Sequence, residues 1–468
     1  MGETVQTENP LGYENIGKLI RSFAIPSIIA MLVSSLYNVV DQIFIGQGVG
    51  YLGNAATNVA FPFTTICMAI TLTIGIGSAA RFSLYLGQKE ETEAAKVVGA
   101  GFCMMLLFGV CYAVIGEIFM RPLLWTFGAT KEVFPYVLSY SRITMLGMPF
   151  LVIMNGLSNL ARADGSPMYS MTTMIIGAVL NIVLDPVFIF GFQWGVAGAA
   201  WATVIGQLVS CLFAGRYLWH FKRITLKKEY FRFSFSQAGK TIVMGMSNGL
   251  TQIAITVVQI VMNRSLIHYG ALSIYGTDIP LAASGVVMKV NSIVFAVFIG
   301  LNQGMQPIVG FNYGAKFYSR VKKTYFNVIK VILAISLAAL FVFQVFPDRV
   351  LLIFGKENKL YMEFAVMFMR TFLLFLPLGG VQMLSSNFFA AIGKPVRGAV
   401  LSLTRQVFFL IPLMLILPLF FGIKGVLYAA PGADLLAFLV VFFFILMEMR
   451  AMTQTESERN IDEKDTES

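Results

Sequence analysis

Long apolar segments are the feature that most limits what this chain of 468 residues can fold into. A helix needs about 20 apolar residues in succession to cross a membrane, and segments of this kind recur along almost the whole chain. Because backbone polar groups inside a bilayer must be paired within the protein, the segments are expected to be helices. The twelve predicted spans are 18–45, 54–85, 95–118, 136–160, 168–191, 196–220, 238–263, 281–310, 321–346, 362–388, 396–420 and 425–449.

Charged residues are too few to cover a water-facing surface of this size. They make up 12% of the chain and apolar residues 57%, whereas soluble domains have roughly 25% and 45–50%. The composition therefore excludes a soluble enzyme, a disordered protein and a nucleic-acid binder. It predicts an all-α polytopic membrane protein with twelve transmembrane helices, and no nucleotide-binding loop, zinc helix or serine nucleophile motif supports an enzyme.

Basic residues are concentrated in alternate loops, which predicts the orientation of the chain. The loop between spans six and seven (221–237) is strongly basic, and so are those between spans eight and nine and between spans ten and eleven, whereas the loops 46–53 and 191–196 carry no charge. Because basic loops stay on the cytoplasmic side, both termini are expected to be cytoplasmic. The acidic segment 451–468 is expected to be a disordered tail.

The sequence repeats itself after six spans. The segment GSAARFSLYLGQK (77–89) aligns with GMQPIVGFNYGAK (304–316) at an offset of 227 positions, and DGSP (164–167) aligns with IGKP (392–395) at 228. An offset of six spans preserves topology, so it predicts two parallel repeats related by a pseudo-two-fold axis along the membrane normal. The expected organisation is an N-terminal segment 1–17, a first lobe 18–220, a basic linker 221–237, a second lobe 238–450 and the tail 451–468.

Two acidic residues lie well inside spans of the first lobe, where a charge is costly and marks a candidate functional site. Asp41 follows Tyr37 by one helical turn, and Asp185 follows Asn181 by one turn; Thr203 lies in the next span. Carboxylate, amide and hydroxyl oxygens suit H⁺ or Na⁺. The predicted coupling-ion site therefore comprises Asp41, Asp185, Asn181, Thr203 and Tyr37, although a structural hydrogen bond between helices is the alternative.

The repeat makes the first-lobe acids more informative. At the aligned positions of the second lobe, Asp185 corresponds to Leu413, Asn181 to Phe409 and Asp41 to Met262. The acidic set is therefore expected in one lobe alone.

Other polar residues inside the second-lobe spans have open roles. Arg405 and Asp434 lie at similar depth, so they are expected to form a buried ion pair or to line a cavity. Lys289 faces either a cavity or an acid across the lobes, and Gln303 and Gln306 either line a cavity or bridge helices.

Several segments resemble the MATE family of multidrug and toxic compound extrusion transporters, in its bacterial MepA-like and DinF-like branch. The segments, which belong to a resemblance covering residues 15–450, are SLYNVVDQIFIGQ (35–47), ARADGSPMY (161–169), LNIVLDPVFIFG (180–191), GVAGAAWAT (195–203) and QPIVGFNYGAK (306–316). The resemblance implies twelve helices in two six-helix lobes. It also implies ion binding at Asp41 and Asp185, with Asn181 and Thr203 as further ligands and Tyr37 nearby.

The resemblance further implies an antiporter that exports small, often cationic, amphiphilic compounds in exchange for H⁺ or Na⁺. No cofactor beyond this coupling ion is expected, nor any nucleic-acid partner. The expected partners are small organic substrates and membrane lipids, and the expected form is a monomer in a bacterial plasma membrane. A lipid-linked saccharide flippase of the same superfamily and, less favoured, a channel are the alternatives.

Overall fold

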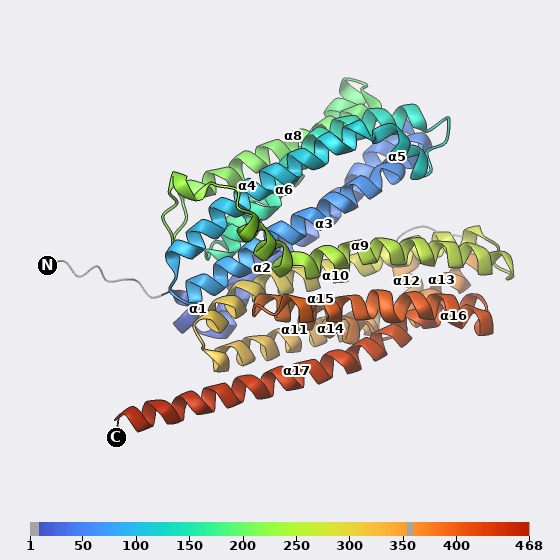
Figure 1. Cartoon of the computed structure of the whole chain (residues 1–468). Helices are drawn as coiled ribbons and strands as arrows, with labels where there is room; N and C mark the ends of the chain where they lie inside the picture. Colours follow the sequence, from blue (N-terminus) through green and yellow to red (C-terminus); the bar gives the residue numbers. More distant parts are fainter. Residues whose placement is uncertain (1–8, 353–358, 468) are drawn as a thin grey trace.

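The computed structural model describes residues 9–352 and 359–467, and it is helical along nearly all of them (Figure 1). Eleven of the described helices are long and apolar enough to cross a membrane, and a bent pair of helices supplies up to one more. The chain is therefore a multi-pass α-helical membrane protein, as the apolar segments predict.

The first group of helices begins with a short turn, α1 (Pro10–Tyr13), whose first turn is capped by Asn9. A second short helix, α5 (Met120–Thr126), precedes α6, and the short π-helical segment η1 (Val187–Gly191) extends α7. The six spanning helices are α2 (Ile16–Val49), α3 (Tyr51–Gly87), α4 (Glu91–Ile118), α6 (Phe134–Ala163), α7 (Pro167–Pro186) and α8 (Gly195–Arg216).

The linker contains two 3₁₀ turns, Tyr217–Trp219 and Lys228–Tyr230. The second group of helices follows it: α9 (Phe235–Ala271), α10 (Asp278–Gly314), α11 (Tyr318–Val345), the short α12 (Pro347–Leu352), α13 (Lys359–Phe372), α14 (Leu376–Ala391), α15 (Pro395–Leu403), the π-helical segment η4 (Thr404–Leu410), α16 (Ile411–Phe421) and α17 (Ile423–Glu467).

Two parts of the second group differ from the sequence-based expectation. The predicted span 362–388 is broken between α13 and α14 by a bend of 48°, where Pro377 in the first turn of α14 lacks an N–H for a continuous helix. The predicted disordered tail 451–468 instead continues α17 as a helix to Glu467. Lys322 of α11 contacts this extension through a 3.0 Å ion pair with Glu456.

Backbone geometry recurs at the repeat offset. Lys89 and Lys316, 227 positions apart, both have positive φ angles, 62° and 60°. Gly195 and Gly422, again 227 positions apart, have φ angles of 57° and 56°. A lysine rarely adopts a left-handed conformation, so its recurrence at matched turns indicates that the two groups of helices are homologous lobes.

The two lobes meet at the side of the bundle where both chain termini lie, and they diverge toward the opposite side (Figure 1). We call these the termini side and the distal side. Helix α3 packs on α9, and α2 packs on α10. A Cβ atom on Gly245 of α9 would lie 1.8 Å from the Thr73 carbonyl oxygen, and one on Gly314 of α10 would lie 2.3 Å from that of Leu84. Only glycine permits such close contact between lobes.

Hydrogen bonds reinforce this termini-side seam. Arg81 of the first lobe, 3% exposed, donates to the Gln237 carbonyl oxygen at 3.1 Å and to Thr241 Oγ1 at 2.8 Å. From the second lobe, Arg320 donates to the carbonyl oxygens of Leu11 and Glu14 at 3.1 and 2.7 Å. The structure therefore represents a state that is closed on the termini side.

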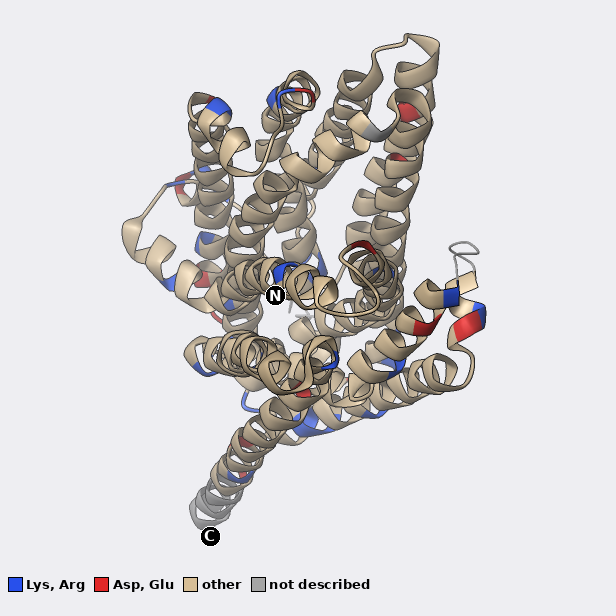
Figure 2. Cartoon of the chain, turned by 90° about the vertical axis from the view of Figure 1, so that its right-hand side faces the viewer, with Lys and Arg blue, Asp and Glu red and all other residues tan. Residues whose placement is uncertain are grey.

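Charged residues are sparse along the helices when the molecule is viewed from the distal side (Figure 2). Many large apolar side chains are exposed on the outer faces, including Leu212 at 67% and Phe420 at 75%. Such faces are compatible with contact to lipid chains, because a bilayer removes the cost of exposing them. The few buried charges therefore stand out as candidates for function.

Candidate ion and substrate site

The two first-lobe carboxylates come together in the distal half of the lobe. Helix α2 supplies Asp41 and the last turn of α7 supplies Asp185, which are 9% and 0% exposed. The two carboxyl groups lie close enough to interact electrostatically. Pro186 follows directly, and the chain continues as η1, whose i→i+5 turns are rare and frequent at functional sites. The structure therefore brings the two acids predicted from the sequence into one buried place in the first lobe.

Asn181 and Thr203 extend this pair into a set of oxygens. The Asn181 amide donates to Asp185 Oδ1 at 3.3 Å and to Thr203 Oγ1 at 3.2 Å. Asp41 Oδ1, Asp185 Oδ2 and Asn181 Oδ1 are buried and have no hydrogen-bond partner among the described residues. Oxygens of this kind are hard donors that fit a proton or Na⁺, so the donor chemistry of the residues fits the ion expected there.

Two tyrosines complete the surroundings of the acidic pair. Tyr37 of α2 interacts electrostatically with both carboxyls. Tyr140 of α6 also interacts with Asp41, Asp185 and Tyr37, and sequence reasoning missed it. A tyrosine in an apolar span carries no signal of its own, and the repeat does not point to it, so the packing of α6 was needed to find it.

A cavity adjoins the ion-site residues inside the first lobe. Tyr37, Asn181 and Thr203 form part of its wall, and the rest includes side chains that can accommodate varied shapes: Met68, Met154, Met174, Asn155 and Gln207. Methionine is flexible and polarizable, and it is frequent at surfaces that bind several ligands. The candidate ion-site residues Tyr37, Asn181 and Thr203 therefore form part of the wall of this cavity.

The buried acids of the second lobe have a different environment. Arg405 Nε donates to Asp434 Oδ1 at 2.5 Å, which confirms the ion pair expected from their depth. Glu448, 2% exposed, pairs with Arg397 at 2.9 Å and also with Lys394. Each of these carboxylates therefore has a basic partner in the protein.

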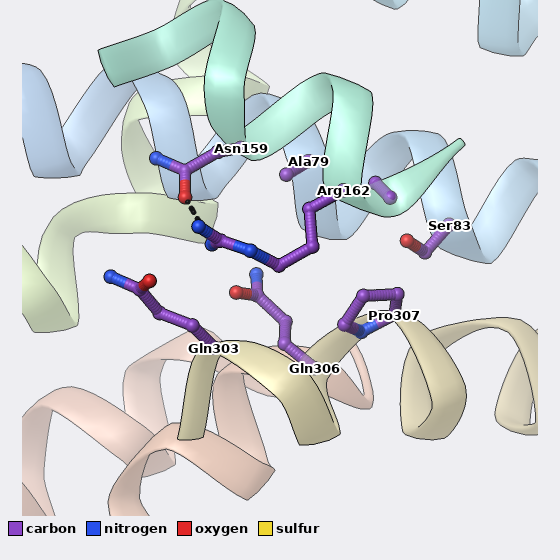
Figure 3. A pocket seen from close by; sticks show the side chains of 8 residues that line it. Ala79, Ser83, Asn159, Arg162, Gln303, Gln306 and Pro307 are labelled. Atoms are coloured by element: carbon purple, nitrogen blue, oxygen red, sulfur yellow. Dashed lines mark hydrogen bonds between the residues drawn. The ribbon is translucent and has the colours of Figure 1, made fainter. Parts of the chain in front are cut away.

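Gln303 and Gln306 lie in the termini-side seam and not beside the acidic pair. Gln306 Nε2 donates across the lobes to the Ile76 carbonyl oxygen at 3.3 Å, and Gln303 contacts Met31 Sδ at 3.8 Å. Figure 3 shows both glutamines beside Arg162, across a narrow space between the lobes. Both of the roles that the sequence left open are seen: the two glutamines line this narrow space, and they contact helices of the other lobe.

Arg162 itself was not singled out from the sequence. It is 3% exposed, and it donates to Asn159 Oδ1 at 3.0 Å (Figure 3) and to Ser170 Oγ at 2.9 Å. A basic residue one turn from the end of a predicted span usually extends to the membrane surface. The inward direction of Arg162 depends on how the lobes pack, which the sequence does not reveal.

Lys289 is exposed on the distal half of α10, apart from the acidic pair and from the seam glutamines. Neither a salt bridge nor a hydrogen bond of its side chain is found in the part of the chain that the structure describes. Of the second-lobe polar residues predicted from the sequence, Lys289 is therefore the one whose side chain has no partner among the described residues.

The chain has two lobes of six helices that are related by a repeat and closed against each other on one side. A buried candidate ion site lies beside a cavity in the first lobe. These features define a membrane transporter and not an enzyme. The chain belongs to the MatE family, whose profile matches residues 26–187 and 248–416.

Relatives and solved structures agree with this assignment. The multidrug export protein MepA of Staphylococcus haemolyticus is 27% identical over 448 residues, which cover 93% of this chain and 95% of that protein. MepA of Staphylococcus aureus is 25% identical, with 94% and 96% covered. A MOP-superfamily transporter structure from Pyrococcus furiosus superposes with a TM-score of 0.87 at 23% identity, covering 95% of this chain and 98% of that one. An outward-facing multidrug resistance MATE transporter gives 0.87 at 24% identity, with the same coverage. These structures establish the fold.

Proposed function

We propose that this transporter is a secondary antiporter that exports small, often cationic, amphiphilic organic compounds in exchange for H⁺ or Na⁺. The observation that carries the proposal is the acidic pair Asp41–Asp185, which has no basic partner among the described residues and whose neighbours Tyr37, Asn181 and Thr203 line the methionine-rich cavity. The similarity to multidrug export proteins of staphylococci supports the substrate class.

The coupling ion compensates the charge of the two carboxyls. Two carboxylates held close together away from water repel each other. A bound proton or Na⁺ relieves this repulsion with a positive charge that the surrounding protein does not supply. Asp41 belongs to α2, which also forms part of the termini-side seam, so ion binding changes how α2 packs against α7 and α10. This link connects the ion site to the lobe arrangement.

Substrate and ion binding are linked through the shared cavity wall. Asn181, Thr203 and Tyr37 contact or adjoin the acidic pair and also face the cavity. A ligand shifts a conformational equilibrium only when its affinities for the two states differ. Ion binding therefore promotes substrate release on the distal side, and the seam then opens on the termini side to accept the next substrate.

The proposed setting is a bacterial plasma membrane with both termini in the cytoplasm. The basic linker 221–237 and the basic loops on the same side support this orientation through the positive-inside rule. Under this orientation, the distal side faces outward, and the described state is closed toward the cytoplasm. We also propose that the chain works as a monomer surrounded by lipid.

Transport in proteoliposomes tests the proposal. Ethidium movement would be followed by fluorescence under separately imposed H⁺ and Na⁺ gradients for wild type, Asp41→Asn and Asp185→Asn. We expect one gradient to drive wild-type transport and both variants to fall to background. The double variant Arg405→Gln/Asp434→Asn, which removes a paired acid together with its cation, is the control and should retain coupled transport. If both single variants keep the gradient-driven ethidium transport of wild type, the site assignment is refuted. If no gradient drives ethidium transport by wild type, the antiport function is refuted.

A further inference from the structure

Arg162 is a buried charge that the proposed mechanism does not use. It lies one residue before the end of α6, on the termini side, and it donates to Asn159 and Ser170 of its own lobe. Its Nε is buried and has no hydrogen-bond partner among the described residues. Asp164, the nearest acid in the sequence, accepts from Tyr217 instead. No carboxylate pairs with Arg162 in the part of the chain that the structure describes, so its charge is uncompensated there.

The second lobe covers Arg162 without supplying an acceptor for it. Figure 3 shows Gln303 and Gln306 of α10 facing the guanidinium across the narrow space between the lobes, but their amides contact Met31 and the Ile76 carbonyl oxygen instead. Gln303 Oε1 is itself buried without a partner among the described residues. The space is too narrow to hold a water molecule, so water does not bridge its two sides in this state.

This arrangement raises the energy of the closed state. Burying a donor without an acceptor is unfavourable, and more so when the donor is charged, because water would otherwise bind it. The bonds to Asn159 and Ser170 lie within the first lobe, so they persist whether the lobes are together or apart. The unsatisfied Nε is buried only while the termini-side seam is closed. Arg162 therefore destabilises the closed state relative to one in which water enters the seam.

Arg81 has the opposite arrangement in the same seam. It is as buried as Arg162, at 3% exposed, but it donates across the lobes to the Gln237 carbonyl oxygen and to Thr241 Oγ1. These charge-assisted hydrogen bonds require that the lobes be in contact, so Arg81 stabilises the closed state. Two buried arginines of the first lobe thus act on one seam with opposite sign.

Resting on the change of lobe arrangement in the proposed function, we propose that Arg162 is a gating residue whose uncompensated charge promotes opening of the termini-side seam, against the closing effect of Arg81. Arg162 touches neither the ion site nor the cavity of the first lobe, so it is a positioning residue. The coupling ion changes which state is favoured, and the two arginines set the balance from which the ion starts.

Distances between spin labels on the two lobes test this proposal. Thr92 of α4 and Ser319 of α11 are exposed on the termini side, at repeat positions 227 apart. Both would be changed to cysteine in a full chain whose four native cysteines are replaced by alanine. Double electron–electron resonance in lipid nanodiscs then gives the ratio of open to closed molecules.

The two arginines should change this ratio in opposite directions. We expect Arg162→Met to lower it about tenfold, the scale of one unsatisfied buried polar group, and Arg81→Met to raise it by a similar factor. Where few wild-type molecules are open, Arg162→Met is measured in the Arg81→Met background, and it should return the ratio toward that of wild type. Arg162→Lys keeps the charge and should stay near the wild-type ratio.

A matched control and a second variant separate gating from folding. Arg142, an exposed arginine on the distal half of the same helix, pairs with Glu117, and Arg142→Met should leave the ratio unchanged. If Arg162→Met does not fold, Gln303→Leu removes the unsatisfied amide that faces Arg162 and should also lower the ratio. Melting temperatures of all variants identify a general loss of stability, which does not predict opposite changes at the two arginines.

The outcomes against the proposal are distinct. An unchanged or higher ratio in Arg162→Met, the same result in Gln303→Leu where Arg162→Met does not fold, or an equal fall in Arg142→Met would overturn the gating role and leave the proposed antiport intact. A single distance in wild type and all variants, at every pH and sodium concentration, would contradict both this inference and the change of lobe arrangement in the proposed function.

Discussion

The buried acids of the two lobes are neutralised in different ways. In the second lobe, Asp434 pairs with Arg405, and Glu448 pairs with Arg397 and Lys394. In the first lobe, Asp41 and Asp185 approach each other and have oxygens without hydrogen-bond partners.

This difference separates structural from functional charges. A carboxylate with a permanent cation gains little from binding another ion, whereas two neighbouring buried carboxylates require a proton or a metal cation to compensate their charge. Burial alone therefore does not identify the coupling site, because Asp434 is 3% exposed and Asp185 is 0% exposed. The absence of a basic partner is the informative property.

The largest effect should come from giving the first-lobe pair a permanent cation. Thr203 lies next to Asn181 and the acidic pair, so Thr203→Lys places an ammonium group near these acids, as Arg405 lies near Asp434 in the other lobe. We expect gradient-driven ethidium transport to fall to background and the melting temperature to rise. Thr203→Met, of similar length without charge, should retain more transport. Equal transport by the two variants would show that a fixed charge does not replace the coupling ion.

Breaking the second-lobe pair should affect stability. Asp434→Leu alone leaves Arg405 buried without its partner and should cost about 3–5 kcal/mol, whereas Arg405→Met/Asp434→Leu should be near neutral. Reversible unfolding in mixed micelles measures both. If the double variant folds and loses ion coupling, the pair has a transport role and the contrast between the lobes fails.

Asp164 offers a third kind of buried acid, in the turn between α6 and α7 outside the membrane-spanning segments. It accepts hydrogen bonds from Tyr217 Oη at 2.8 Å and from the Lys222 N–H at 2.6 Å. Burial raises the pKa of this carboxyl from 3.8 to about 6, against the opposing effect of its donors.

The pH dependence of the linker follows from that raised pKa. The closed linker binds the proton more tightly than an opened, solvated one, so the closed form is favoured below pH 4 and loses this advantage as pH rises through 6. We expect opening at Lys222 to be about tenfold more frequent at pH 7.5 than at pH 5. Hydrogen exchange corrected for intrinsic rates measures it, and Asp164→Asn should remove the difference. A pH dependence that persists in Asp164→Asn would assign the effect to another group.

The smallest effect is expected at the exposed end of α17. Lys322 and Glu456 form a 3.0 Å pair with side-chain exposures of 22% and 33%, and exposed pairs contribute about 0–1 kcal/mol. Glu456→Gln and a truncation after residue 456 should leave unfolding and transport within error of wild type. A clear loss of transport in the truncated chain would show that the tail is not dispensable.

The sequence predicts much of the fold because membrane spans are encoded in long apolar segments. The count of spans, the repeat and the Arg405–Asp434 pair could all be inferred from position and depth along helices. The break between α13 and α14 could not, because Pro377 is compatible with either a kink or a new helix start. The helical tail was also missed, because its acidic composition is typical of disorder. Its contact with Lys322 joins residues far apart in the sequence, so it cannot be inferred from the tail alone.

The site residues that were missed depend on which face of a helix meets another element. Tyr140 reaches the acidic pair from α6, and Arg162 turns into the seam, but neither direction follows from spacing within one helix. The roles proposed for Asp41 and Asp185 stay predictions until the bound ion is measured.

Direct ion binding is the measurement that tests the central claim most directly. Purified wild type, Asp41→Asn and the Arg405→Gln/Asp434→Asn variant would be titrated, with proton uptake followed by a pH indicator and sodium binding by radioactive ²²Na⁺. The account predicts that wild type and the second-lobe variant bind the same coupling ion equally, and that Asp41→Asn loses it. Undiminished ion binding by Asp41→Asn, or its loss in the second-lobe variant, would contradict the assignment of coupling to the unpaired acids.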